Sequence, residues 1–255
     1  MRVSELDPQA AAIAMKFAPA PTPAPGSIDM NVRDLVMQFE SLGGRGLGCE
    51  FGIFQRDCGA EPLGLLRFSD MPCDMLLFAL RNRFGGVGLD ENTELLVNPT
   101  PGGPGEYCTR DRRGMMFQRT FVYENDMSPE RMRVSALRRL RFLADKLIDD
   151  LENAAKIFVY RISDRRLAPD EILALHDAIR AYGRGTLLYV QLQDGEHRNG
   201  AVELIRPGLM IGYIDRFKIS PTDQLSAAPP TGSWLAICRA AHALWTETIP
   251  PSLPR

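Results

Sequence analysis

The stretch 156-KIFVYRISDRRLAPDEILALHDAIRAYGRGTLLYVQLQ-193 decides the fold. Its two ends, Lys156–Ile162 and Thr186–Gln193, are runs of aliphatic and aromatic residues that are typical of buried strands. Between them, Pro169–Tyr182 has apolar residues at helical spacing and is followed by Gly183, which favours a helix end. A strand, a helix and a second buried strand in this order predict a right-handed crossover between parallel strands.

The rest of the chain predicts further strands and helices around this unit. We expect a short strand in Leu35–Leu42, a glycine loop and then a helix from Cys49. Further elements are expected at Asp70–Phe84 (helix), Tyr107–Arg112 and Met115–Tyr123 (strands), from Ser128-Pro129 (the longest helix), around the turn Arg206–Leu209 (two strands) and at Trp234–Trp245 (helix). We therefore predict an α/β protein, a three-layer sandwich with a mostly parallel sheet. A papain-like α+β arrangement is the alternative.

The domain organisation follows from composition. Residues 1–29 are rich in alanine and proline and show no lasting periodicity, so we expect a flexible tail. The remaining residues, 30–255, are long enough for a single α/β domain with a core of its own.

Composition and charge exclude several function classes. The net charge of −2 gives no global positive field, so we expect no nucleic-acid partner. No stretch approaches the ~20 consecutive apolar residues of a membrane span. The five cysteines form no CxxC pair and lie in no histidine cluster, which argues against a disulfide framework, a zinc site or another metal centre. A cytoplasmic protein without a cofactor fits these observations best.

One glycine-rich segment, Ser41–Gly52, carries the candidate site. Its glycines let the backbone approach a ligand or another strand closely, and the N–H groups of the following helix are suited to an anion. The helix dipole there is expected to lower the pKa of the Cys49 thiol, which would make Cys49 a nucleophile. The candidate ligand-binding residues are Gly43, Gly44, Arg45, Gly46, Gly48 and Glu50 of this segment, with Arg119.

Three hypotheses for this segment remain open. The first is a tight turn that allows a strand and a helix to pack, with Cys49 as a small buried residue. The second is cysteine chemistry, which needs a base close to the thiol. The third is a nucleotide or S-adenosylmethionine site, although the glycines do not follow the spacing G-x-G-x-x-G.

A base for Cys49 has few candidates, because the chain has three histidines. His176 and His242 lie on apolar helix faces, where a structural role is expected. His197 instead follows the strand that ends at Gln193, and ligands of such sheets gather beyond the carboxyl ends of strands. We therefore take Cys49, His197 and Asp194 as candidate catalytic residues.

The longest helix has an unusual order of charges. Its first half holds five arginines and its second half four acidic residues, which opposes the helix dipole: Arg131, Arg133, Arg138, Arg139 and Arg141, then Asp145, Asp149, Asp150 and Glu152. An anionic ligand or an acidic partner would explain the arginines. Pairs within the helix, such as Arg141 with Asp145, explain them more simply and are the favoured interpretation.

A family resemblance rests on Phe39–Phe54 together with Gly59–Phe68. This segment resembles a group of uncharacterised alphaproteobacterial proteins with a Ser-Leu-Gly…Asn-Cys-Glu-Phe-Gly core, which often accompany polysaccharide genes. More distantly, it is similar to a papain-like cysteine peptidase family of unknown function that begins Ser-Leu-Gly-x-x-Cys. The resemblance extends to Asp194 and implies that Cys49 is the family cysteine and Asp194 the acidic residue that ends the late strand.

This chain departs from the family pattern at two places. The family's middle histidine is expected at Phe117–Phe121, where this chain has none, and the residues Arg45–Gly48 are an insertion. The resemblance implies a protein of surface-polysaccharide metabolism, a cysteine-dependent hydrolase or transferase. The alternatives are a non-catalytic binding module of the same fold and a nucleotide-binding protein. The expected partner is a small molecule, such as a carbohydrate or nucleotide-sugar, or another protein.

Overall fold

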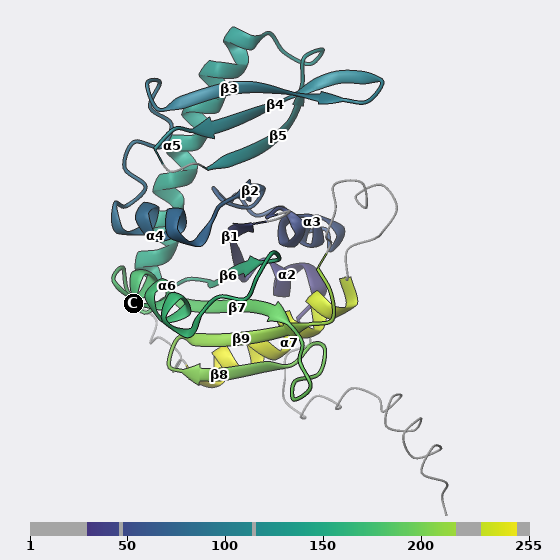
Figure 1. Ribbon diagram of the computed structural model, residues 1–255, viewed down its shortest axis with the longest axis vertical. Coiled ribbons are helices and arrows are strands. Elements are labelled where there is room, and N and C mark those ends of the chain that lie inside the picture. Colours follow the sequence, from purple (N-terminus) through teal and green to yellow (C-terminus); the bar gives the residue numbers. More distant parts are fainter. Residues whose placement is uncertain (1–29, 46–47, 114–115, 218–230, 249–255) are drawn as a thin grey trace, which may run out of the picture. The chain divides into compact units, whose positions relative to one another are not determined.

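A computed structural model describes residues 30–45, 48–113, 116–217 and 231–248 of the chain (Figure 1). Contacts within the chain group residues 31–255 into one compact unit. The tail predicted for residues 1–29 lies outside the described residues.

The compact unit alternates helices and strands along the chain. In order, the described elements are α2 (Val32–Val36), β1 (Phe39–Arg45), α3 (Glu50–Asp57), β2 (Ser69–Asp70), α4 (Cys73–Arg81), β3 (Thr93–Thr100), β4 (Gly103–Asp111), β5 (Phe117–Tyr123), α5 (Pro129–Asn153), β6 (Ile157–Ile162), α6 (Pro169–Arg180), β7 (Thr186–Leu192), β8 (Val202–Arg206), β9 (Leu209–Ile214) and α7 (Thr231–Thr248).

One mixed sheet joins these strands in the order β3-β4-β5-β2-β1-β6-β7-β9-β8. The strands at its centre, from β2 to β9, pair in parallel. Strands β3, β4, β5 and β8 add antiparallel pairs at the two sides. The prediction of a mostly parallel sheet is therefore wrong. The short β3–β4, β4–β5 and β8–β9 connections leave no room for the crossover that parallel neighbours need.

Helices cover both faces of the central strands, which confirms the α/β class. Successive residues of β6 alternate between two cores: Phe158, Tyr160 and Ile162 belong to one, Ile157 and Val159 to the other. The first core also contains residues of α4, α5 and α6, and the second contains residues of α2, α3 and α7. The papain-like α+β alternative does not describe this arrangement.

The predicted unit at 156–193 is present as β6, α6 and β7, with β6 and β7 parallel and in register from Ile157–Thr186 onward. Helix α5 begins as expected, because the Ser128 side chain accepts a hydrogen bond from Arg131 N–H and Pro129 occupies the first turn. The predicted hairpin is β8–β9, with Gly208 at φ 81° in its turn.

The order of the strands creates a topological switch point between β1 and β6. The chain runs from β1 through α3 to β2 on one side, and from β6 through α6 to β7 on the other side (Figure 1). Helices α3 and α6 accordingly belong to the cores on opposite faces of the sheet. Such a switch point is where open α/β sheets hold their ligands.

Candidate functional site

The predicted glycine loop is partly a strand. Gly43, Gly44 and Arg45 belong to β1, whose pairing with β6 is interrupted by a bulge between Ser41 and Gly44. A Cβ atom on Gly44 would lie 3.1 Å from the carbonyl carbon of Arg161 and closer still to its oxygen. The glycine therefore lets β1 lie close to β6.

The end of the glycine segment is packed just as closely. A Cβ atom on Gly48 would lie 3.0 Å from Gly44 N and closer still to the Ser69 and Gly44 oxygens. Protein backbone thus occupies the space that the phosphates of a nucleotide would need at Gly44 and Gly48. Gly46 lies outside the described residues.

Cys49 lies directly before helix α3, and only 7% of it is exposed. The expectation of a lowered thiol pKa is wrong. Burial raises the pKa of Cys49, and this effect exceeds the opposite influence of the Arg119 and Arg161 charges. The charged groups with the largest influence on the thiol are these two arginines and Glu50.

Glu50 is also buried, and its contacts join three elements. Trp234 Nε1–H of α7 donates to Glu50 Oε1 at 2.9 Å, and Arg161 Nη2 of β6 lies 3.4 Å from Glu50 Oε2. The Arg161 guanidinium lies over the Phe217 ring, 5.0 Å from its centroid. A buried carboxylate with such partners has a structural explanation that needs no ligand.

Asp194 and His197 are brought together beyond the end of β7. The Asp194 Oδ1 atom lies 2.8 Å from His197 Nδ1 and also accepts the backbone N–H of His197 at 2.9 Å. The hydrogen bond from His197 lowers the pKa of Asp194. The imidazole stacks on Tyr213 at 3.9 Å between ring centroids, and Nε2 is 3.6 Å from Glu203 Oε2. Of the three predicted catalytic residues, these two form a pair and Cys49 has other neighbours.

His176, for which a structural role was expected, is 5% exposed. Its Nδ1 atom lies 3.2 Å from Asp177 Oδ1 and 2.6 Å from Arg206 Nη2, and its Nε2 atom is 3.3 Å from Pro207 O. Burial lowers the pKa of this histidine.

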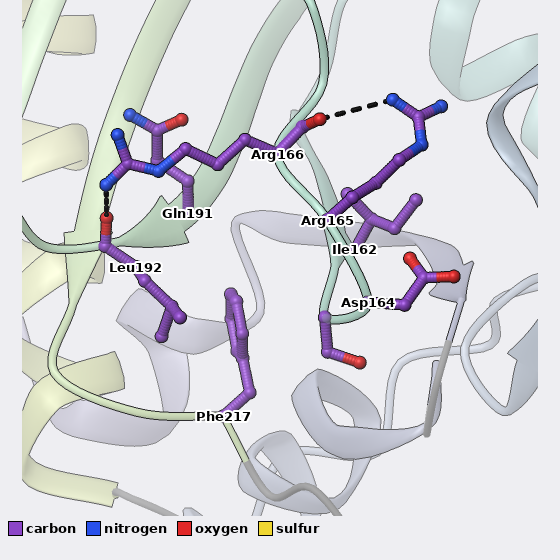
Figure 2. A pocket seen from close by; sticks show the side chains of 8 residues that line it. Ile162, Asp164, Arg165, Arg166, Gln191, Leu192 and Phe217 are labelled. Atoms are coloured by element: carbon purple, nitrogen blue, oxygen red, sulfur yellow. Dashed lines mark hydrogen bonds between the residues drawn. The ribbon is translucent and has the colours of Figure 1, made fainter.

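A pocket of about 200 Å³ opens at the carboxyl ends of β6 and β7 (Figure 2). We call it the carboxyl-end pocket, and its lining residues are Ile162, Ser163, Asp164, Arg165, Arg166, Gln191, Leu192 and Phe217. Figure 2 shows the Phe217 ring standing between Leu192 and the turn that carries Asp164. Apolar side chains thus form one wall, and charged or amide groups surround them.

Hydrogen bonds hold the polar side chains of the carboxyl-end pocket in place. Arg166 Nη2 donates to Leu192 O at 2.8 Å, and Arg165 Nη1 donates to Arg166 O at 3.2 Å (Figure 2). The Ser163 hydroxyl donates to Arg45 O at 3.1 Å, which ties this turn to the end of β1.

The charges around the carboxyl-end pocket are balanced in pairs. Arg45 Nε lies 3.1 Å from Asp164 Oδ2. Arg165 binds both oxygens of Glu171, each at 2.6 Å. Arg166 Nη1 lies 3.6 Å from Asp194 Oδ2, which links the pocket to the pair of Asp194 and His197. The pocket therefore offers polar groups without a large excess of either charge.

Arg119 lies apart from this pocket, on β5, and lines a second cavity. Its guanidinium binds the buried Glu106, with Nε 2.9 Å and Nη2 2.6 Å from Oε2. Most residues of the carboxyl-end pocket were not predicted from the sequence. The signal was available in Ser163–Arg166, a polar turn directly after a predicted parallel strand, because ligands gather at such positions.

In the part of the chain that the structure describes, no three or more His, Cys, Asp or Glu residues come together in a way that could hold a metal ion. Within the same ranges, every helix is too short or too polar to span a bilayer.

Comparisons with known proteins add no relative. A scan against protein-family models gives no match, and searches among curated proteins and among solved structures give none either.

Proposed function

We propose that this chain is a non-catalytic binding module that takes a small carbohydrate in the carboxyl-end pocket. The observation that carries the proposal is the pocket itself, an apolar wall with fixed polar groups at the carboxyl ends of β6 and β7, next to the switch point between β1 and β6.

The groups in the pocket match the surface of a sugar. A sugar ring has hydroxyl groups that both donate and accept hydrogen bonds, and C–H faces that are apolar. Gln191 offers an amide donor and an amide acceptor, Asp164 offers an acceptor, and Arg166 offers donors. Phe217 and Leu192 supply apolar surface beside them. The balanced charge favours a neutral ligand, and the volume of about 200 Å³ suits one sugar unit.

The environment of Cys49 supports binding rather than cysteine catalysis. A nucleophilic cysteine needs a thiolate and an adjacent base. Here burial raises the thiol pKa, and the nearby charges are two arginines and a glutamate. The thiol is packed at the start of α3, as expected of a small structural residue.

The family resemblance supports the choice of ligand, because it implies a role in surface-polysaccharide metabolism. A cytoplasmic protein in such a role would meet monosaccharides and nucleotide-sugars. A nucleotide-sugar would place its sugar in the pocket and its diphosphate outside it.

Isothermal titration calorimetry on the full chain tests this proposal. The probes are glucose, galactose, N-acetylglucosamine and UDP-glucose, and at least one is expected to bind. Gln191→Ala should weaken that binding about tenfold, since a lost hydrogen bond from a polar site contributes roughly 1–1.5 kcal/mol. Gln193→Ala is the matched control, because Gln193 directly follows β7 and does not line the pocket. Binding that is absent, or equally weakened by both substitutions, would overturn the proposal.

A second candidate function is acid–base chemistry on the bound ligand, which the pair of Asp194 and His197 favours. A carboxylate hydrogen-bonded to one ring nitrogen fixes the imidazole and leaves the other nitrogen for proton transfer. Incubating each probe with the protein and analysing products by mass spectrometry tests this function. A product formed by the wild type and lost in His197→Ala would establish it, while unchanged probes would leave binding as the function.

A further inference from the structure

A second cavity, of about 260 Å³, lies between β4, β5, α5 and the segment that precedes β2. Its most unusual feature is its arginines, which come from four separate parts of the chain. They are Arg56 of α3, Arg67 of the segment before β2, Arg119 of β5 and Arg139 of α5. We call this cavity the arginine cavity.

Aromatic rings hold three of these arginines in place. The Arg56 guanidinium lies 4.9 Å from the centroid of Phe68 and 4.7 Å from that of Phe121. Arg119 lies over Phe121 and Arg67 over Phe68, each at 4.7 Å. The two rings contact each other edge to face at 4.8 Å. The cationic groups are thus positioned before any ligand arrives, which reduces the entropy lost on binding.

Phe121 is held in a strained conformation to make this arrangement. Its φ of 56° lies in the left-handed region, which a bulky residue rarely adopts. The buried carboxylate of Glu106 stabilises the strained residue, because Oε1 accepts the Phe121 N–H at 2.9 Å while Oε2 binds Arg119. Backbone strain of this kind clusters at ligand sites.

The arginine cavity has an excess of positive charge. Glu61 is the acidic residue that lines it, and its carboxylate is shared between Arg56, at 2.8 Å, and Arg67. Arg139 has no ion-pair or hydrogen-bond partner in the described part of the chain. This excess of guanidinium groups calls for an anion with several acceptor oxygens.

The lining also includes apolar side chains, which limit what the anion can carry. They are Leu63, Val122, Met127, Met132, Ala136 and Leu140. A free inorganic anion would leave this surface without a partner. A volume near 260 Å³ is below the ~300 Å³ at which typical ligand pockets begin, so the ligand must be small.

We propose that the arginine cavity binds a phosphate monoester with a compact apolar ester group. A phosphate monoester carries about −1.5 to −2 charges and three acceptor oxygens, which matches the excess charge better than the single charge of a carboxylate. Arg56 and Arg139 bind the phosphate at the exposed side, and the ester group lies against the apolar lining. This site is independent of the carboxyl-end pocket and of the proposed carbohydrate.

Isothermal titration calorimetry with phenyl phosphate on the full chain tests the site. We expect wild-type binding that weakens with added salt, and a loss of about tenfold or more in Arg139→Gln and in Arg56→Gln, since a charged hydrogen bond is lost in each. Arg138→Gln is the matched control: Arg138 is the exposed neighbour of Arg139 on α5 and does not line the cavity. Circular dichroism verifies that each variant is folded.

Two comparisons separate the proposed ligand class from the alternatives. Benzoate has the same ring with one charge, and inorganic phosphate has the charge without the ring, so both should bind at least about tenfold more weakly. Equal affinity for benzoate or for inorganic phosphate would overturn the assignment. So would the absence of phenyl phosphate binding at millimolar concentration, or an equal loss in Arg138→Gln and Arg139→Gln.

Discussion

The substitution Gly52→Ala reverses the usual effect of alanine in a helix. Gly52 lies inside α3, where alanine normally stabilises by about 0.5–1 kcal/mol relative to glycine. Here, however, an added Cβ atom would lie 2.5 Å from the Arg67 oxygen and 2.7 Å from Arg67 Cγ. Because real Cβ atoms do not approach other atoms within 3.0 Å, Arg67 or the helix must move by several tenths of an ångström or more.

Arg67 has little freedom to move. Its Nη2 atom donates to Gly52 O and to Ala60 O, each at 3.0 Å, and its Nη1 atom binds Glu61. Inserting a methyl group into such a packed contact costs about 1–3 kcal/mol. This cost exceeds the helix-propensity gain of about 0.5–1 kcal/mol, so we expect a net loss of roughly 1–2 kcal/mol in the free energy of unfolding.

Urea denaturation followed by circular dichroism measures this loss. The matched control is Gly232→Ala in α7, where an added Cβ atom would meet nothing within 4 Å. Gly232→Ala should raise the free energy of unfolding by up to about 1 kcal/mol. Stabilisation by Gly52→Ala as large as that by Gly232→Ala would refute the expected clash between an added Cβ atom and Arg67.

Three further predictions concern a helix end, a histidine and the thiols. Replacing Ala154, which ends α5 at φ 51°, with glycine should stabilise the protein by about 0.5–1 kcal/mol in the same urea titration. Ala181→Gly, at the end of α6 with φ −64°, should not stabilise it. Burial holds the pKa of His176 below its usual 6.5, so as the pH falls this histidine is protonated in the unfolded chain before it is protonated in the folded protein. The free energy of unfolding should therefore fall as the pH drops below about 6.5. His176→Gln should show a smaller fall between about pH 7.5 and 5.5. Iodoacetamide followed by peptide mapping should modify Cys58, which is partly exposed, faster than the buried Cys49, and the opposite order would contradict the structural role of Cys49.

Much of the central fold is predictable from local patterns. Strands β6 and β7 are buried on both faces, so they appear in the sequence as continuous apolar runs on either side of a helical pattern. Helix α5 is marked by Ser128 and Pro129, which act within the first turn and need no distant partner.

The errors come from features that depend on distant contacts. Gly43 and Gly44 indicate a loop when taken alone, yet they belong to β1, and the backbone of Arg161 in β6 lies against Gly44. Strand β3 was not predicted, since its second half is exposed and contains Asn98-Pro99. The antiparallel pairing of β5 with β2 joins segments that are distant in the sequence, which a local pattern does not contain.

The candidate site was predictable only in part. The proximity of Asp194 and His197 follows from their positions in the sequence, because they are three positions apart in one turn. The environment of Cys49 does not, because Arg161 and Trp234, which surround the adjacent Glu50, come from distant parts of the chain. Burial, which raises the pKa of the Cys49 thiol, likewise depends on the packing of the folded chain.

The most direct test of the central claim is a ¹⁵N-HSQC titration of the full chain with the sugar that calorimetry identifies as a ligand. If the carboxyl-end pocket binds a carbohydrate, the largest shift changes will fall on the backbone amides of Ser163–Arg166, Gln191 and Leu192. Amides of Gly48–Phe51, around the buried thiol, should change little. Changes that centre on Gly48–Phe51 instead, or that spread evenly over the protein, would contradict the account.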